Sequence, residues 1–177
     1  MSRIRNKNYL STGGSVCRFK KGETLLSLGI KSGDKVIIFK SANFDSYLLA
    51  NSVSYAGAVA IMISPHFSSE VFAQLHNRLN NSWVIFDDET RTQVEYTDIP
   101  PTRKIDCLEL SNEKLISSQT EISPRRWGTE DSIVYMTHTS GTTGIPKLIS
   151  LSPNSMSWRV IFQRRMISGV YQSGIAA

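Results

Sequence analysis

The sequence is poor in the residues and segments that mark several protein classes. It has only 2 cysteines in 177 residues, Cys17 and Cys107, and neither belongs to a spaced set of metal ligands. This usage argues against a disulfide-dense secreted scaffold. We expect two ordinary thiols in a reducing compartment and a cytoplasmic protein, with a single disulfide as the alternative. The basic N-terminus also lacks the apolar segment of a secretory signal.

Long apolar runs are scarce as well. The longest charge-free stretch runs from residue 46 to residue 69, and it contains Asn51, Ser52, Ser54 and Gly57. A membrane-spanning helix needs about 20 predominantly apolar residues. We therefore interpret this stretch as a buried helix followed by a buried strand and expect no membrane span.

The excess of positive charge is small. The formal net charge is +5, from 20 Lys+Arg and 15 Asp+Glu, and the basic residues lie in short, separate groups. A nucleic-acid-binding surface usually combines a continuous basic patch with aromatic residues, and no such pattern is visible. The charge therefore gives little support to nucleic-acid binding, whereas it is compatible with a small anionic ligand.

Apolar patterns predict alternating strands and helices. The order implies crossover connections, and hence an α/β fold with a mainly parallel sheet flanked by helices. Ser41 or Asn43 is expected to cap the first helix, and Gly57 to end it. The expected strands are residues 36–39, 59–64, 82–88, 104–110, 131–139 and 147–152, the helices are 41–58, 68–79 and 152–166, and loops are expected at 92–101 and 122–130.

One loop between two predicted strands has the composition of a phosphate site. It reads HTSGTTGIPK from residue 138 to residue 147. Glycines let backbone N–H groups converge on an anion, hydroxyls add donors, and Lys147 adds a mobile positive charge. An exposed polar turn is the alternative. A Walker A loop is excluded because Pro146 precedes the lysine and Leu148 follows it.

The segment from Thr139 to Lys147 resembles the signature loop T-S-G-T-T-G-x-P-K of the adenylate-forming superfamily, with all eight fixed positions matched. This superfamily includes acyl-CoA synthetases, peptide-synthetase adenylation domains and luciferases. A more diffuse likeness covers roughly residues 24 to 160. The resemblance implies a partial N-terminal domain of such an enzyme. We expect a loosely patterned leader at 1–24, the partial AMP-binding domain at 25–166 and an unpatterned tail at 167–177.

The resemblance also implies an activity and a set of binding residues. In this superfamily a carboxylate attacks the α-phosphate of ATP, with Mg²⁺ present, and a thiol of CoA or of a carrier protein then takes the acyl group. The acid is expected to be a fatty acid. The residues implied to bind the phosphates are Thr139, Ser140, Gly141, Thr142, Thr143, Gly144 and Lys147.

Later motifs of the superfamily are absent from the sequence, including the acidic metal motif, the ribose-binding aspartate and the catalytic lysine. We therefore assign no catalytic or metal-binding residue, and we expect this chain alone to be marginally stable and inactive. The alternative is a non-catalytic module that binds a nucleotide or a partner. His138 precedes the loop and is expected to be structural, while His66 and His76 lack metal-ligand companions.

Overall fold

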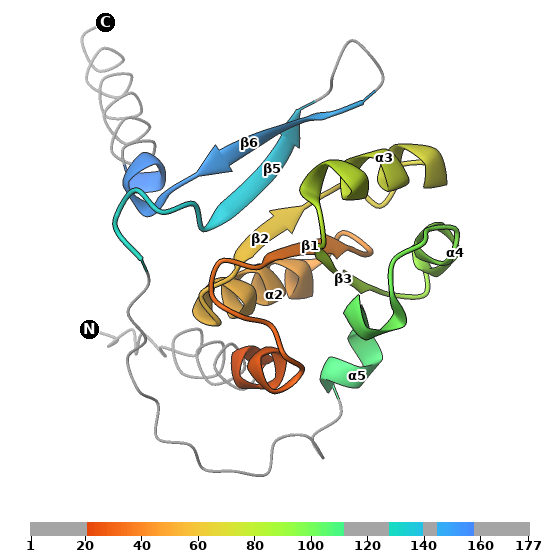
Figure 1. Cartoon of the computed structure of the whole chain (residues 1–177), viewed down its shortest axis with the longest axis horizontal. Helices are drawn as coiled ribbons and strands as arrows, with labels where there is room; N and C mark the ends of the chain where they lie inside the picture. The colour runs from red at the N-terminus through yellow and green to blue at the C-terminus, as the bar shows by residue number, and fades with distance from the viewer. Residues whose placement is uncertain (1–20, 112–127, 140–144, 158–177) are drawn as a thin grey trace, which may run out of the picture.

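The computed structural model describes residues 21–111, 128–139 and 145–157 (Figure 1). These residues form one six-stranded sheet with the strand order β4-β3-β1-β2-β5-β6. The strands β1 to β5 are parallel where they pair, and β6 returns antiparallel to β5. The strands are β1 (Lys35–Phe39), β2 (Val59–Met62), β3 (Trp83–Phe86), β4 (Lys104–Asp106), β5 (Tyr135–Thr139) and β6 (Lys147–Leu151).

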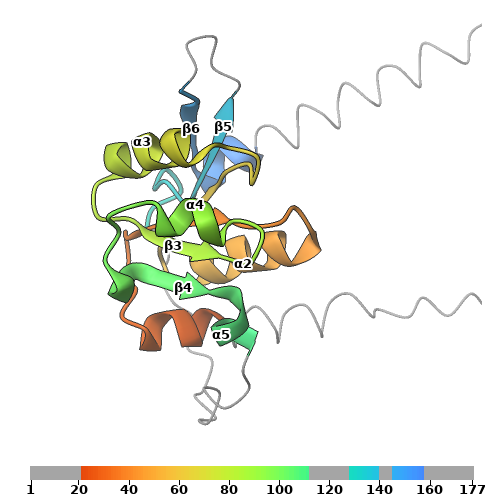
Figure 2. The same cartoon turned by 90° about the vertical axis from the view of Figure 1, so that its right-hand side faces the viewer.

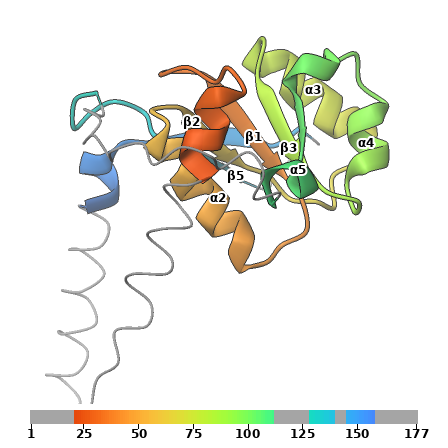
Figure 3. The ribbon, with the colours of Figure 1, turned by 90° about the horizontal axis from the view of Figure 1, so that it is seen from below.

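Helices cover both faces of the parallel strands, which confirms the predicted α/β class. One face carries a helix over residues 21–27, α2 and α5, and the opposite face carries α3 and α4. Figure 3 shows the first group in front of the strands and α3 behind them. The labelled helices are α2 (Phe44–Tyr55), α3 (Ser69–Leu79), α4 (Arg91–Glu95) and α5 (Cys107–Ser111), with the 3-10 turn η1 (Pro101–Arg103) before β4.

Two hydrophobic clusters fill the space between the sheet and these helices. Because successive side chains of a strand point to opposite faces, β1 contributes to both clusters. Val36 and Ile38 pack with Leu49 and Val53 of α2, whereas Ile37 and Phe39 pack on the α3 side. The continuous apolar runs of β1 and β3 are therefore explained by burial on two faces.

Local chemistry sets the ends of the main helices. Asn43, one of the two predicted caps, accepts a hydrogen bond from the backbone N–H of Ser46 and starts α2. Gly57 follows the end of α2 with φ +79°, a conformation that glycine adopts without strain. A Cβ atom there would also lie 3.1 Å from the Ser32 hydroxyl oxygen. The predicted buried helix and strand between residues 46 and 69 are thus confirmed.

The structure corrects two expectations. The strand predicted at residues 104–110 ends at Asp106, because its carboxylate accepts a hydrogen bond from the Leu108 N–H and starts α5. The loop predicted at 92–101 contains most of α4, which is too short to show helical periodicity. Residues 21–27 are helical and overlap the segment interpreted as a loose leader, and Leu25 is fully buried.

The remaining elements agree with the sequence patterns within a few residues. A helix begins after Ser152, whose hydroxyl accepts a hydrogen bond from the Ser155 N–H; its predicted continuation beyond residue 157 lies outside the described residues. The division of the chain into a leader (1–24), a partial AMP-binding domain (25–166) and a tail (167–177) stays a prediction. In the described ranges no helix is both long and apolar enough to cross a membrane.

Candidate functional site

The predicted phosphate loop begins and ends on one β-hairpin. The antiparallel register places Thr139, the last residue of β5, directly opposite Lys147, the first residue of β6. Both side chains are exposed. In Figure 2 this hairpin lies at the end of the sheet opposite α5. The fold therefore holds the two ends of the signature segment side by side at the carboxyl end of β5.

Thr139 and Lys147 lie on the same face of the sheet as α2, which covers other strands of that face. Tyr135 of β5 packs against the cluster on the α2 side, and Met136 packs against the cluster on the α3 side. Alternation along β5 then places Thr139 on the same face as Tyr135. Lys147 shares that face because directly opposed residues of an antiparallel pair point to the same side. A hydroxyl and an ammonium group thus lie side by side on one face of the hairpin.

The middle of the signature segment is not placed. Ser140, Gly141, Thr142, Thr143 and Gly144 lie outside the described residues. Their expected contacts with phosphate therefore stay predictions. The described part of the segment fits a phosphate in its chemistry, because an exposed lysine and a threonine hydroxyl are both able to donate hydrogen bonds to anionic oxygens.

His138 lies on the opposite face from Thr139. Its ring meets the Phe67 ring edge to face, with centroids 4.8 Å apart, and its strand partner is Leu148. The Nδ1 atom is buried and has no hydrogen-bond partner among the residues that the structure describes. Desolvation lowers the pKa of His138 below its ordinary value, which favours a neutral imidazole at neutral pH. The packing with Phe67 is the structural role that the sequence suggested.

Other reactive side chains have local roles or reduced reactivity. The Nε2 atom of His76 lies 3.4 Å from the Ser82 carbonyl oxygen, and desolvation lowers the pKa of this histidine. Burial raises the pKa of the Cys107 thiol to about 12, so this group is protonated at neutral pH. The part of the chain that the structure describes holds no cluster of three or more metal-ligating His, Cys, Asp or Glu residues.

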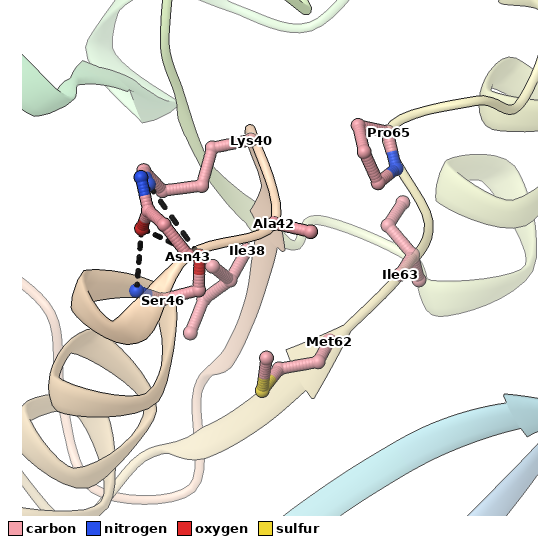
Figure 4. A pocket seen from close by; sticks show the side chains of 8 residues that line it. All are labelled: Ile38, Lys40, Ala42, Asn43, Ser46, Met62, Ile63 and Pro65. Carbon is pink, nitrogen blue, oxygen red and sulfur yellow. Dashed lines mark hydrogen bonds between the residues drawn. The ribbon is translucent and has the colours of Figure 1, made fainter.

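The structure adds Lys40, a residue that the sequence interpretation passed over. It follows β1 directly, and its side chain is buried beside the first turn of α2. It lines a hollow of about 290 Å³ between the ends of β1 and β2, where Met62 and Pro65 form part of the other wall (Figure 4). A lysine placed directly after four apolar strand residues was the available sequence signal. The burial of Lys40 could not be predicted from this signal, because it depends on the packing of α2 beside the end of β1.

Comparison with protein families and curated proteins identifies the relatives of this chain. The family model described as AMP-binding enzyme matches residues 19–173. The chain is 28% identical over 144 residues to 4-coumarate–CoA ligase 2 of Petroselinum crispum, with 75% of this chain and 26% of that protein covered. It is 32% identical over 143 residues to 2-succinylbenzoate–CoA ligase of Bacillus cereus, covering 78% and 25% respectively. The chain thus spans about a quarter of the length of these relatives.

Solved structures show the same fold. The N-terminal domain of FACL13 from Mycobacterium tuberculosis, solved with an inhibitor, aligns with a TM-score of 0.67 at 23% identity. The alignment covers 79% of this chain and 36% of that one. The fold agrees with the family match, which extends over most of the sequence and includes the signature loop. The chain belongs to the AMP-binding enzyme family.

Proposed function

We propose that this chain forms the phosphate-binding N-terminal part of an ATP-dependent acid–thiol ligase. The observation that carries the proposal is the hairpin in which Thr139 and Lys147 bring the two ends of the signature loop together. The carboxyl edge of a parallel sheet is where ligands bind in open α/β folds. The family match and the ligases among the relatives support the same assignment.

In the proposed reaction a carboxylate oxygen attacks the α-phosphorus of ATP. The new C(O)–O–P bond forms as the bond between the α-phosphorus and the oxygen that bridges the α- and β-phosphates breaks, and pyrophosphate leaves. A thiol then attacks the acyl carbon and gives up its proton, so that a C–S bond forms as the acyl C–O bond breaks and AMP leaves. Mg²⁺ would neutralise charge on the phosphates when bound. Lys147 and the Thr139 hydroxyl would hold the terminal phosphates together with Ser140, Gly141, Thr142, Thr143 and Gly144.

We further propose that the acid is carried by a pocket built mainly outside this chain, and that CoA or a carrier-protein thiol accepts the acyl group. A fatty acid stays the prediction from sequence. The relatives named above are ligases of 4-coumarate and 2-succinylbenzoate, so aromatic acids belong in any substrate panel. The cytoplasmic location likewise stays a prediction.

The first test is ATP binding with Mg²⁺ to the full 177-residue chain, measured by calorimetry. We expect binding to the wild type and about a tenfold or greater loss in Lys147→Ala, because a charge-assisted hydrogen bond contributes about 1.5–3 kcal/mol. Lys31→Ala is the matched control, since Lys31 is an exposed lysine before the amino end of β1. Equal affinity in wild type and Lys147→Ala would overturn the assignment of Lys147.

The second test is acid-dependent pyrophosphate exchange with fatty and aromatic acids. We expect no exchange by this chain alone, because it spans only about a quarter of the curated relatives. Binding of ATP without exchange is therefore the result expected for this chain alone. Exchange above background would contradict the expected inactivity and would establish adenylation directly. Absence of ATP binding would refute the phosphate site itself.

A further inference from the structure

The connections of β1 and β2 leave the sheet in opposite directions. From β1 the chain passes through α2 on one face to β2, and from β2 it passes through α3 on the other face to β3, beyond β1. The loops after these two neighbouring strands therefore diverge. Such a topological switch point opens a crevice at the carboxyl ends of the strands, where open α/β sheets bind ligands.

A hollow of about 290 Å³ occupies this switch point. Its size is near the lower end of ligand pockets, which are about 300–1,000 Å³, so it suits a small organic molecule. Figure 4 shows the polar side chains beside the first turn of α2 and the apolar ones on β1, on β2 and after β2. The lining residues are Ile38, Lys40, Ala42, Asn43, Ser46, Met62, Ile63 and Pro65.

The lysine of this crevice is unusual in its burial. Lys40 is only 5% exposed. Its Nζ donates to Asn43 Oδ1 at 3.0 Å, while its hydrogen bonds to Ser41 O at 3.3 Å and Ser46 Oγ at 3.4 Å are long. An ammonium group has three N–H donors, and N–H···O bonds are normally 2.7–3.2 Å long. Each N–H donor of Lys40 thus has an acceptor, but the two long bonds are weak and can be exchanged for a bond to a closer acceptor.

The positive charge of Lys40 is only partly offset by its acidic neighbour. Asp87 Oδ2 lies 3.9 Å from Nζ and also accepts a hydrogen bond from the Ser41 N–H at 3.0 Å. The N-terminus of the 12-residue helix α2 adds positive potential beside the crevice. Asp45 in the first turn of α2 is paired with Lys21 at 2.7 Å, so Asp87 is the nearby carboxylate left to Lys40, and its 3.9 Å ion pair leaves room for a second carboxylate.

We propose that this crevice binds a small monocarboxylate, with the carboxylate on Lys40 and an apolar body against Met62, Ile63 and Pro65. A single, partly balanced ammonium matches one negative charge better than a phosphate group, because burying a second charge without a partner is costly. The apolar lining favours a body of the size of a benzene ring over a polar one. None of the residues that line this crevice belongs to the signature loop, and the binding that we propose does not require ATP.

The test uses the full chain with ¹³C-methyl-labelled methionine, titrated with benzoate in the absence of ATP. Met62 lines the crevice, whereas Met136 packs on the α3 side and serves as an internal control. Met62→Leu assigns the signal among the five methionines. We expect benzoate to shift the Met62 methyl and leave Met136 unchanged. Benzamide, which has the same shape without the charge, should bind at least about tenfold more weakly.

Two substitutions test separately the charge of Lys40 and the free volume of the hollow. Lys40→Met retains the apolar stem and should bind benzoate no better than benzamide, whereas Lys31→Ala should behave as wild type. Ala42→Leu keeps the lysine and fills the hollow, so it should block benzoate even if Lys40→Met does not fold. The proposal is overturned if benzoate leaves Met62 unshifted, if benzamide binds equally well, or if Ala42→Leu binds like wild type. Because ATP is absent, these outcomes are independent of the phosphate-loop test.

Discussion

The parallel strands β1 and β3 and the β5–β6 hairpin belong to one sheet but differ in their surroundings. Every residue of β3 and four of the five residues of β1 are buried, because helices cover both faces. In β5 no residue is buried, and in β6 only Leu151 is. The comparison separates two tasks: the covered strands supply the hydrophobic core, and the hairpin presents the ends of the signature loop.

The more exposed hairpin and the covered strands place two lysines in different surroundings. Lys147 is exposed at the border of the sheet, whereas Lys40 is enclosed where α2 meets the covered strands. An exposed lysine is free to move and suits a charged ligand from solvent. An enclosed lysine has fixed neighbours and suits a small ligand of one shape. Four substitutions can break or sharpen this contrast.

The largest effect is expected from Phe72→Ala in the covered region. The Phe72 and Phe39 rings stack with centroids 4.4 Å apart, and both side chains are fully buried. Removing the ring leaves a cavity, so we expect a loss of about 3–5 kcal/mol in the free energy of unfolding by urea denaturation. Leu148→Ala in the hairpin is the comparison and should cost less than half as much. Equal losses would contradict the contrast.

A smaller loss is expected from Thr90→Val, which removes a hydroxyl from the covered region. The buried Thr90 hydroxyl donates to the Phe39 carbonyl and so ties the turn before α4 to β1. A buried carbonyl that loses its partner costs about 1–3 kcal/mol. Thermal unfolding should show this loss, whereas the same substitution at the exposed Thr92 should have little effect. A harmless Thr90→Val would show that water replaces the hydroxyl.

His138→Phe should change the pH dependence of stability more than stability itself. The folded chain lowers the pKa of His138 below the ordinary value of 6.5, so the unfolded chain binds more protons below that pH. Wild type should therefore lose stability as the pH falls below 6.5.

The variant should lose less over this range, and it should gain up to about 1 kcal/mol at neutral pH because the unpartnered Nδ1 is gone. Urea titrations at several pH values measure both effects, with His66→Phe as the control for an added ring. The dependence of the free energy of unfolding on pH should not vanish in His138→Phe, because the pKa of His76 is lowered as well. An unchanged slope in His138→Phe would argue against a desolvated imidazole.

The smallest effect on stability is expected from Lys147→Ala. The Lys147 side chain is exposed, so its removal should leave the thermal midpoint unchanged within error while ATP binding weakens about tenfold or more. Thermal unfolding with and without ATP and Mg²⁺ measures both quantities, because a ligand of the folded state raises the midpoint. A lowered midpoint without ligand would mean that the hairpin depends on this lysine for folding.

Much of the fold was predictable because strands and long helices follow local periodicity. The runs that form β1, β2, β3 and α3 carry their pattern within a few residues, and each was placed correctly apart from its ends. The short helices α4 and α5 were missed because five residues hold too little periodicity to recognise. Their starts depend on contacts such as that of the Asp106 carboxylate with the Leu108 N–H.

The candidate site was predictable only in part. The order of residues in the signature loop indicated the family, and the family match confirms it. The pairing of Thr139 with Lys147 required the antiparallel return of β6, which the loop sequence did not specify. Lys40 was missed because its enclosure depends on Asn43 and Ser46 of the next helix and on Met62 of another strand.

The sequence by itself determined the alternation of strands and helices, the class of the fold and the identity of the signature loop. These features depend on neighbouring residues, whose spacing is written directly in the chain. The tertiary structure decided which strands lie side by side, which face Thr139 and Lys147 share, and which lysine is enclosed. Those features depend on strand register and crossover direction, and a shift of register by one residue would turn each side chain to the opposite face.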